Sequence, residues 1–255
     1  SKGEAAATEV RAVPGTGTVE LVDLDVADTR SIRAAADTIK ALVDGLDAVI
    51  NNAGVMQTPP RTTADGFELQ FGTNHLGHFL LNHLLFDLVA DRGGRIVPVA
   101  SMAHLRGRIH FDDIMLTSNY SPTTAYCQSK LANLMYGFEL GRRLEAAGSA
   151  VISASAHPGY ANTNLQSSGP EGVLEKLYSV TNLFAQSAHA GAVPEVLAAA
   201  GDEARNGAYY GPTQFGGWRG KVGDARSAKA ARNTEDARRL WELSEELLGI
   251  EFTVH

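Results

Sequence analysis

Tyr126 and Lys130 stand four residues apart, and Ser101 closes an apolar stretch further upstream. If the first two lie on a helix, they share a face, and the Lys130 ammonium would favour the phenolate of Tyr126. A free tyrosine titrates near pKa ~10, whereas a proton shuttle works best with a pKa nearer the operating pH. With Ser101 hydrogen bonded to a substrate oxygen, these residue types predict acid–base chemistry that accompanies hydride transfer.

The pair alone does not decide the matter, because a tyrosine and a lysine at this spacing also occur by chance as exposed neighbours on a helix. The elements that would position them are therefore informative. Short apolar runs rich in branched residues predict strands, and apolar residues at helical spacing predict helices. In chain order these are strand 18–26, a helix from 29, strand 46–50, helix 66–90, strand 95–100, helix 126–147 and strand 150–156.

Alternating strands and helices, with nearly continuous apolar strands, indicate an α/β fold. We expect a doubly wound parallel sheet covered by helices on both faces, which is a Rossmann-like three-layer α/β/α arrangement. Polar or small residues follow the predicted strands, and they are Asp25, Asn51-Asn52, Ser101 and His157-Pro158-Gly159. Ligands bind at the carboxyl ends of such strands. Ala53 and Gly54 would let a flat ligand approach the backbone there.

Composition limits the remaining possibilities. A chain of 255 residues with 44% hydrophobic and 20% charged residues suits one large α/β domain. A net charge of -7 without a basic cluster argues against a nucleic acid partner. Cys127 is the single cysteine, and no apolar run reaches the roughly 18 residues of a membrane span. We therefore predict a cytoplasmic protein without a membrane span.

Several segments together resemble the short-chain dehydrogenase/reductase family, in particular the branch similar to retinol dehydrogenases and light-dependent protochlorophyllide reductases. The resemblance covers essentially the whole chain. Its marks are Asn51-Asn52-Ala53-Gly54-Val55-Met56, the run from Asp65 to Phe79, Ser101 with Ala103-His104, the run from Tyr126 to Asn133, and His157-Pro158-Gly159-Tyr160 with Thr163.

The resemblance implies catalytic roles for four positions. Tyr126 would be the general acid/base, and Lys130 would be its electrostatic partner and a ligand of the nicotinamide ribose. Ser101 would orient the carbonyl, and Asn74 would hold a water molecule in the proton relay. The implied activity is NAD(P)-dependent interconversion of a carbonyl and an alcohol, with a small hydrophobic substrate.

The resemblance also implies a cofactor-binding set in addition to Tyr126 and Lys130. Its members are Asp25 and Val26 beside the adenine, Asn52, Ala53 and Gly54 along the dinucleotide, and Pro158, Gly159 and Thr163 at the nicotinamide end. NADP is favoured over NAD, because in this branch a segment such as Lys2-Gly3-Glu4 commonly follows an arginine-containing loop.

The family's first strand, its glycine-rich turn, the following helix and the second strand do not occur in these 255 residues. We interpret 1–13 as the helix after that second strand. We then expect the chain to be a single dinucleotide-binding oxidoreductase domain, 1–255, that is N-terminally incomplete. About 40 more residues are expected upstream from the size of a βαβ unit. Without them, the strands at 18–26 and 46–50 would be separated by a gap of roughly 14 Å.

Other segments leave alternatives open. Residues 164–190 are predicted to form a mobile substrate lid, and the apolar residues inside them would line a substrate pocket or pack as a small helix. His75, His78 and His83 do not reproduce a zinc motif, so no metal site is predicted. The amphipathic stretch 233–248 would serve core packing or contact between subunits of a homo-oligomer.

A second hypothesis comes from another functional class. The chain could be a non-catalytic Rossmann-like module that has lost cofactor binding and acts through a protein partner. The missing glycine-rich turn supports it, whereas the presence of Ser101, Tyr126 and Lys130 argues against it.

Overall fold

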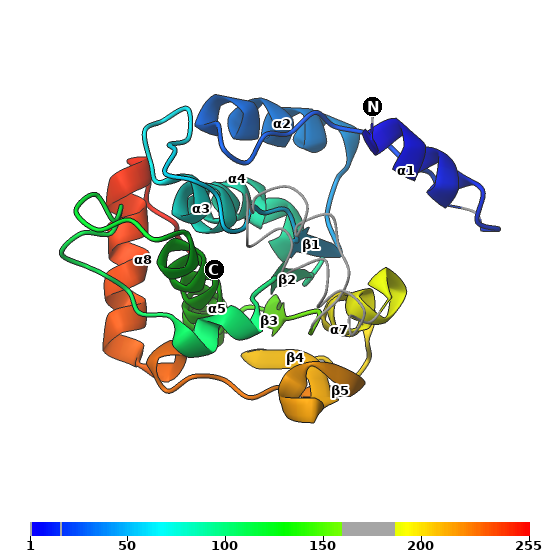
Figure 1. The fold of residues 1–255 in the computed structure, drawn as a ribbon. Helices are drawn as coiled ribbons and strands as arrows, with labels where there is room; N and C mark the ends of the chain where they lie inside the picture. Colours follow the sequence, from blue (N-terminus) through cyan, green and yellow to red (C-terminus); the bar gives the residue numbers. More distant parts are fainter. Residues whose placement is uncertain (1, 16, 160–186) are drawn as a thin grey trace.

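A parallel sheet forms the centre of the protein in a computed structural model that describes residues 2–15, 17–159 and 187–255 (Figure 1). Within these ranges the strand order follows the chain. The strands are β1 (Ala48–Asn51), β2 (Arg95–Pro98), β3 (Ile152–Ala156), β4 (Ala208–Gln214) and β5 (Arg219–Asp224). β1 to β4 are parallel, and β5 is antiparallel to β4. The predicted strands at 46–50, 95–100 and 150–156 are thus confirmed.

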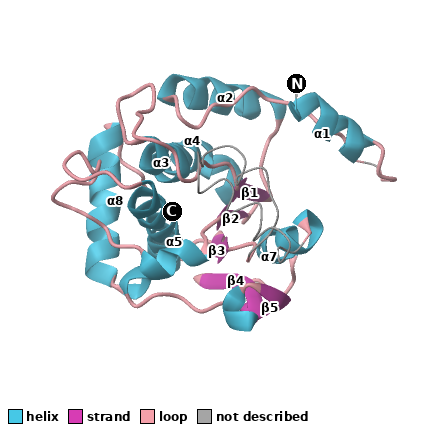
Figure 2. Cartoon of the chain, in the orientation of Figure 1, coloured by secondary structure: helices cyan, strands magenta, loops and turns pink. Residues whose placement is uncertain are grey.

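Helices cover both faces of this sheet, as the doubly wound prediction requires. α4 and α5 lie on one face, with α8 packed against the outer side of α5, and α7 lies on the other face (Figures 1 and 2). The helices are α1 (Lys2–Arg11), α2 (Thr29–Leu42), α3 (Leu69–Phe71), η1 (Gly72–Leu76), α4 (Gly77–Ala90), η2 (Met102–Arg106), α5 (Pro122–Ala147), α7 (Ala188–Ala200), η5 (Phe215–Gly217), η6 (Ala230–Arg232) and α8 (Thr234–Leu248).

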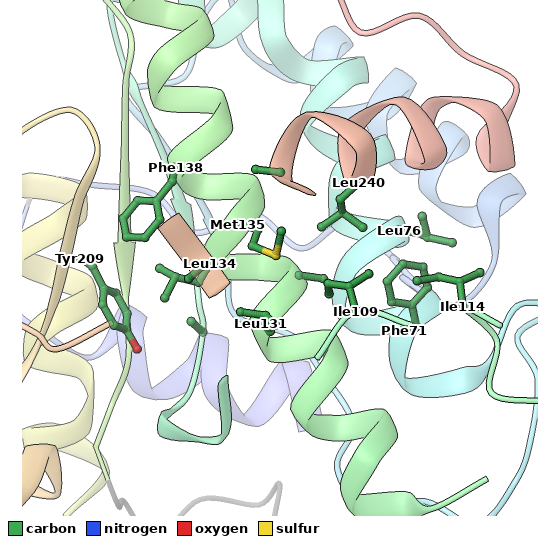
Figure 3. Close-up of a cluster of buried hydrophobic side chains, with 14 residues drawn as sticks. Phe71, Leu76, Ile109, Ile114, Leu131, Leu134, Met135, Phe138, Tyr209 and Leu240 are labelled. Atoms are coloured by element: carbon green, nitrogen blue, oxygen red, sulfur yellow. The ribbon is translucent and has the colours of Figure 1, made fainter. Parts of the chain in front are cut away.

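α5 is the central helix of the core. One of its sides directs apolar residues into a cluster with α3, η1 and α8 (Figure 3). The α5 members of this cluster are Leu131, Ala132, Leu134, Met135 and Phe138. Burial of each such large side chain contributes roughly 1.5–3 kcal/mol. This packing determines how α5 is rotated about its own axis.

Aromatic rings join α8 and the C-terminal tail to α4 and α5. The Phe79 and Trp241 ring centroids are 4.9 Å apart, and those of Trp241 and Phe252 are 5.0 Å apart. Trp241 is buried and also stacks on Tyr136 of α5. The amphipathic stretch 233–248 therefore packs within the chain, and Asn233 caps α8 by accepting hydrogen bonds from two backbone N–H groups.

Glycine lets α5 lie close to the sheet. A Cβ atom at Gly137 would overlap the Ser155 hydroxyl and lie 3.3 Å from Pro98 Cγ. Tyr126, Lys130 and Gly137 lie at helical spacings of four and seven residues, so they share the side of α5 that faces the sheet. The close approach at Gly137 therefore brings the other two side chains to the ends of the strands.

The predicted strand at 18–26 is wrong. The segment forms no strand, and Leu21 and Leu24 are exposed. Alternation of polar and apolar residues indicates a sheet face, but a strand also needs a neighbour for its ladder of hydrogen bonds. No strand among the described residues pairs with this segment.

One further expectation needs correction. The helix predicted at 66–90 starts at Leu69 and contains the π-helical turn η1. Two other segments add to the fold. Tyr209 and Tyr210 lie in β4, after which the chain turns back into β5. The segment between η2 and α5 buries Ile109, Ile114 and Leu116.

Some expectations concern residues 160–186, which lie outside the described part of the chain. These are Thr163, most of the proposed lid at 164–190, and its apolar residues. Among the helices of the described residues, none combines the length and apolarity that crossing a bilayer demands.

The substitution Gly137→Ala tests the close approach of α5. The added methyl group would overlap the Ser155 hydroxyl. We expect an overpacking cost at the upper end of about 1–3 kcal/mol, which outweighs the gain of about 1 kcal/mol that alanine has over glycine in a helix. Urea unfolding measures the loss of stability.

Gly15→Ala is the control, because nothing lies within 4 Å of a Cβ atom at Gly15. If both variants unfold like the wild type, α5 does not need glycine at position 137.

Candidate active site

Tyr126 and Lys130 are a buried pair on the sheet-facing side of α5, not an exposed pair. Their exposed fractions are 7% and 4%. Lys130 Nζ lies 6.0 Å from the centroid of the Tyr126 ring and donates a hydrogen bond to the Val99 carbonyl oxygen at 3.0 Å. Asn133, one turn further along, donates to the same oxygen at 3.1 Å. The side chains are thus held against the end of β2.

Ser101 lies two residues after Val99, just beyond the end of β2. Its hydroxyl oxygen accepts a hydrogen bond from the Ala103 N–H at 3.2 Å and so caps η2. The Ala100 N–H donates to the Ala156 carbonyl oxygen at 2.8 Å, which joins this segment to the end of β3. The main chain at Ser101 is therefore held between α5 and the neighbouring strand.

Asn74 links the segment after β1 to α5. Its Oδ1 accepts from the Val55 N–H at 2.8 Å, and its Nδ2 donates to the Val55 carbonyl oxygen and to Ser129 Oγ, both at 2.9 Å. Asn74 lies in η1, and π-helical turns are rare and frequently occur at functional sites.

Gly54 lies against two of the predicted catalytic residues. A Cβ atom there would be 2.8 Å from Asn74 Oδ1 and 3.9 Å from Lys130 Nζ. The structure therefore brings Asn74, Tyr126, Lys130 and Gly54 into one region, next to the end of the strand that leads to Ser101. A side chain at position 54 would displace the Asn74 amide.

The end of β1 has features that fit a flat polar ligand. Asn52 and Ala53 are exposed there. The Asn51 side chain is 3% exposed, and neither its Oδ1 nor its Nδ2 has a hydrogen-bond partner in the described ranges. A buried amide without a partner is costly. The two exposed residues and the unpaired amide together fit the nicotinamide dinucleotide predicted for this edge.

The other predicted cofactor residues lie in two places. Pro158 and Gly159 form a turn after β3, and Gly159 has a φ of 70°. Asp25 is exposed, and the backbone of Val26 packs against Gly77 at the start of α4. The contacts of Asp25 and Val26 are thus with α2 and α4.

Burial determines the charge of Lys130. Transfer out of water lowers the pKa of this amine to about 8, and the Glu195 carboxylate of α7 acts in the opposite direction. An amine with a pKa near 8 is still mostly protonated at neutral pH. The ammonium that the sequence hypothesis requires is therefore present, and its hydrogen bond goes to a main-chain carbonyl.

Ser129 and Asn133 belong to the motif around Tyr126, but the motif predicts no role for either of them. In the structure they hold Asn74 and the Val99 carbonyl, respectively. Helical spacing could have found Asn133, which lies seven residues after Tyr126 on the same side of α5. The contact of Ser129 with Asn74 spans 55 positions of sequence and has no local signal.

The remaining candidates belong to the core. His75 and His78 are buried, and their rings contact Ser244 Oγ and the Asn74 carbonyl oxygen, both at 2.9 Å. Burial lowers their pKa values to about 3 and about 4. Burial also raises the pKa of the Cys127 thiol, which makes it a poor nucleophile.

Comparison with known proteins decides the family. The model of the short chain dehydrogenase family matches residues 1–173. The chain belongs to this family. It is 40% identical over 252 residues to mouse retinol dehydrogenase 11, covering 98% of this chain and 76% of that protein. Human retinol dehydrogenase 13 is 41% identical over 260 residues, with 98% and 75% covered.

Solved structures agree with this assignment. An uncharacterised protein of Mycobacterium paratuberculosis has 40% identity and a TM-score of 0.80, with 99% of this chain and 82% of that chain covered. A short chain dehydrogenase of Burkholderia cenocepacia, solved in complex with NADP, shares the fold at 19% identity, a TM-score of 0.59, and 82% and 80% coverage. As a member of the short-chain dehydrogenase family, this 255-residue protein is an NAD(P)-dependent oxidoreductase.

The Lys130 amine should make stability depend on pH. Its pKa in the folded protein, about 8, lies below its ordinary value of 10.5, so the unfolded chain binds more protons between these values. Its contribution to the free energy of unfolding therefore rises with pH across this window. Below the window, the full free-energy cost of burying the ammonium applies.

Urea unfolding of the wild type and of Lys130→Met at about pH 7 and about pH 10 measures this effect. The free energy of unfolding of the wild type, relative to that of Lys130→Met, should be higher at about pH 10 than at about pH 7. A difference that is the same at both pH values would contradict the lowered pKa.

Proposed function

We propose that this protein transfers a hydride between NADP, in preference to NAD, and the carbonyl or alcohol carbon of a small hydrophobic substrate, while Tyr126 transfers the proton. The observation that carries the proposal is the buried position of Lys130. Its ammonium donates to the carbonyl oxygen of Val99, two residues before Ser101, and lies 6.0 Å from the Tyr126 ring.

The cofactor and three side chains divide the chemical tasks of this mechanism. A bound nicotinamide supplies or accepts the hydride. In the reducing direction the Tyr126 phenol gives its proton to the substrate oxygen, and in the oxidising direction the phenolate takes it back. The Lys130 ammonium stabilises the phenolate, and the Ser101 hydroxyl orients the substrate oxygen.

Asn74 would act through its main chain. Its side-chain amide is already bonded to Val55 and Ser129. We place the water of a proton relay at its carbonyl oxygen, which also accepts from His78 Nδ1.

The proposed cofactor set follows the strand ends. In addition to Tyr126 and Lys130, Asn52, Ala53 and Gly54 would line the dinucleotide. Pro158, Gly159 and Thr163 would contact the nicotinamide end, and Asp25 and Val26 would border the adenine. The similarity of Lys2-Gly3-Glu4 to the retinol dehydrogenase branch supports NADP. The names of the relatives support a hydrophobic alcohol or aldehyde of the retinoid kind as substrate. A cytoplasmic location and a homo-oligomer remain predictions.

The substitution Tyr126→Phe should lower turnover by about 100- to 10,000-fold, because it removes the general acid/base. Cofactor affinity should change little, since the ring and Lys130 remain. Steady-state kinetics with NADPH and a panel of aldehydes and ketones, on the full-length protein, measure the effect.

Tyr136→Phe is the matched control. Tyr136 is also a buried tyrosine of α5, but its hydroxyl contacts Asn82 in the aromatic core. Equal turnover in wild type and Tyr126→Phe would refute the proton-transfer role. Titration with NADPH and NADH, followed by fluorescence, tests whether the protein is an enzyme or a non-catalytic module. If neither cofactor binds, the non-catalytic module is favoured.

A further inference from the structure

We infer that His104, Tyr209 and His157 form a positioning unit that holds the main chain of Ser101 at a constant distance from the Pro158-Gly159 turn. The inference rests on the function proposed above, in which Ser101 orients the substrate. The three side chains come from η2, β4 and the end of β3, and all are buried. None of them has a role in the mechanism described above.

The contacts of the His104 ring with two main-chain groups specify its protonation, and the Tyr209 hydroxyl lies further away, 3.5 Å from Nδ1. Nδ1 of the ring contacts the Ser101 carbonyl oxygen, and Nε2 lies 3.2 Å from the Ala228 backbone nitrogen. A carbonyl oxygen can only accept and a backbone N–H can only donate. His104 must therefore carry its proton on Nδ1 and be neutral, which ties Ser101 to the segment before α8.

The ring contact of His157 requires the opposite tautomer. Its Nδ1 accepts a hydrogen bond from the Gly159 N–H at 3.1 Å, so the proton of the neutral ring lies on Nε2. The His157 N–H donates to the Tyr210 carbonyl oxygen at 2.9 Å. His157 thus holds the Pro158-Gly159 turn against β4.

Tyr209 lies between the two imidazoles. Its ring centroid is 5.5 Å from that of His104, edge to face, and 5.2 Å from that of His157. A Cβ atom at Gly211 would overlap the His157 ring, so β4 leaves space for this ring only because position 211 is glycine. The three rings fill the space between the Ser101 segment and the turn.

Burial keeps both imidazoles neutral. It lowers the pKa of His104, and it lowers that of His157 to about 4, with a further lowering from His104 nearby. At neutral pH the two opposite tautomers can therefore persist together. The unit transmits position and not protons, and its members are positioning residues for Ser101 and for the turn.

Nitrogen-15 NMR of the imidazole rings tests the inference without requiring turnover. We expect His104 to be protonated on Nδ1 and His157 on Nε2 in the full-length protein at about pH 7. Charged rings, or the Nε2–H form on His104, would overturn the inference. Signals are assigned by loss of the corresponding resonance in His104→Asn and His157→Asn.

A pair of substitutions tests the functional consequence. Asparagine places its amide nitrogen near the position of Nδ1 and can still donate to the Ser101 carbonyl. The glutamine amide oxygen reaches the position of Nε2, so it can accept from the Ala228 N–H, but the contact with the Ser101 carbonyl is lost. We expect His104→Gln to lower kcat by about 10- to 100-fold, with KM for the cofactor unchanged, and His104→Asn to retain most of kcat.

A purely structural role would give a different result. Both variants lose one buried hydrogen bond, so both should then lose similar stability and similar activity. Equal falls in kcat that follow the melting temperature would overturn the inference. If the wild type binds no cofactor and turns over no substrate, the proposed function is wrong. The tautomers measured by NMR would still show whether His104 and His157 make the contacts that the positioning unit requires.

Discussion

The hydrogen bond from the Lys130 ammonium to the Val99 carbonyl joins the central helix to the strand that leads to Ser101. It is buried, and an unpaired ammonium at this position would be strongly disfavoured. Because the charge must be satisfied there, the end of β2 and the middle of α5 are held in one arrangement. The position of Tyr126 relative to Ser101 depends on that arrangement.

Packing on both sides of α5 supports this bond. Leu131, Leu134 and Met135 anchor one side of the helix in the apolar cluster, and Gly137 lets the other side approach β2 and β3. A helix rotated by one residue would turn Lys130 away from Val99 and bury a polar group without a partner. The apolar core thereby sets the orientation of the polar face.

The ends of the strands are held by contacts that the sheet itself does not provide. Asn74 holds Val55 after β1, while His104 and His157 hold the segments after β2 and β3. Loops at the carboxyl end of a parallel sheet are free to vary between members of a fold, so such side-chain contacts decide their geometry. Three neighbouring strand ends then present a defined surface to a ligand.

Local sequence patterns are sufficient to predict the layer architecture, the parallel strands at 46–50, 95–100 and 150–156, the long helix carrying Tyr126 and Lys130, and the family. Periodicity encodes which face of an element is buried, and motifs encode the family, so both can be recognised locally. Which strands pair with one another cannot be recognised from local patterns. The alternating segment 18–26 forms no strand because no described strand pairs with it, and β5 exists because β4 offers it an edge. The role of Ser129, the lowered pKa of Lys130 and the opposite tautomers of His104 and His157 were decided only by the tertiary structure, because each depends on a partner or on burial that arises from residues distant in the chain.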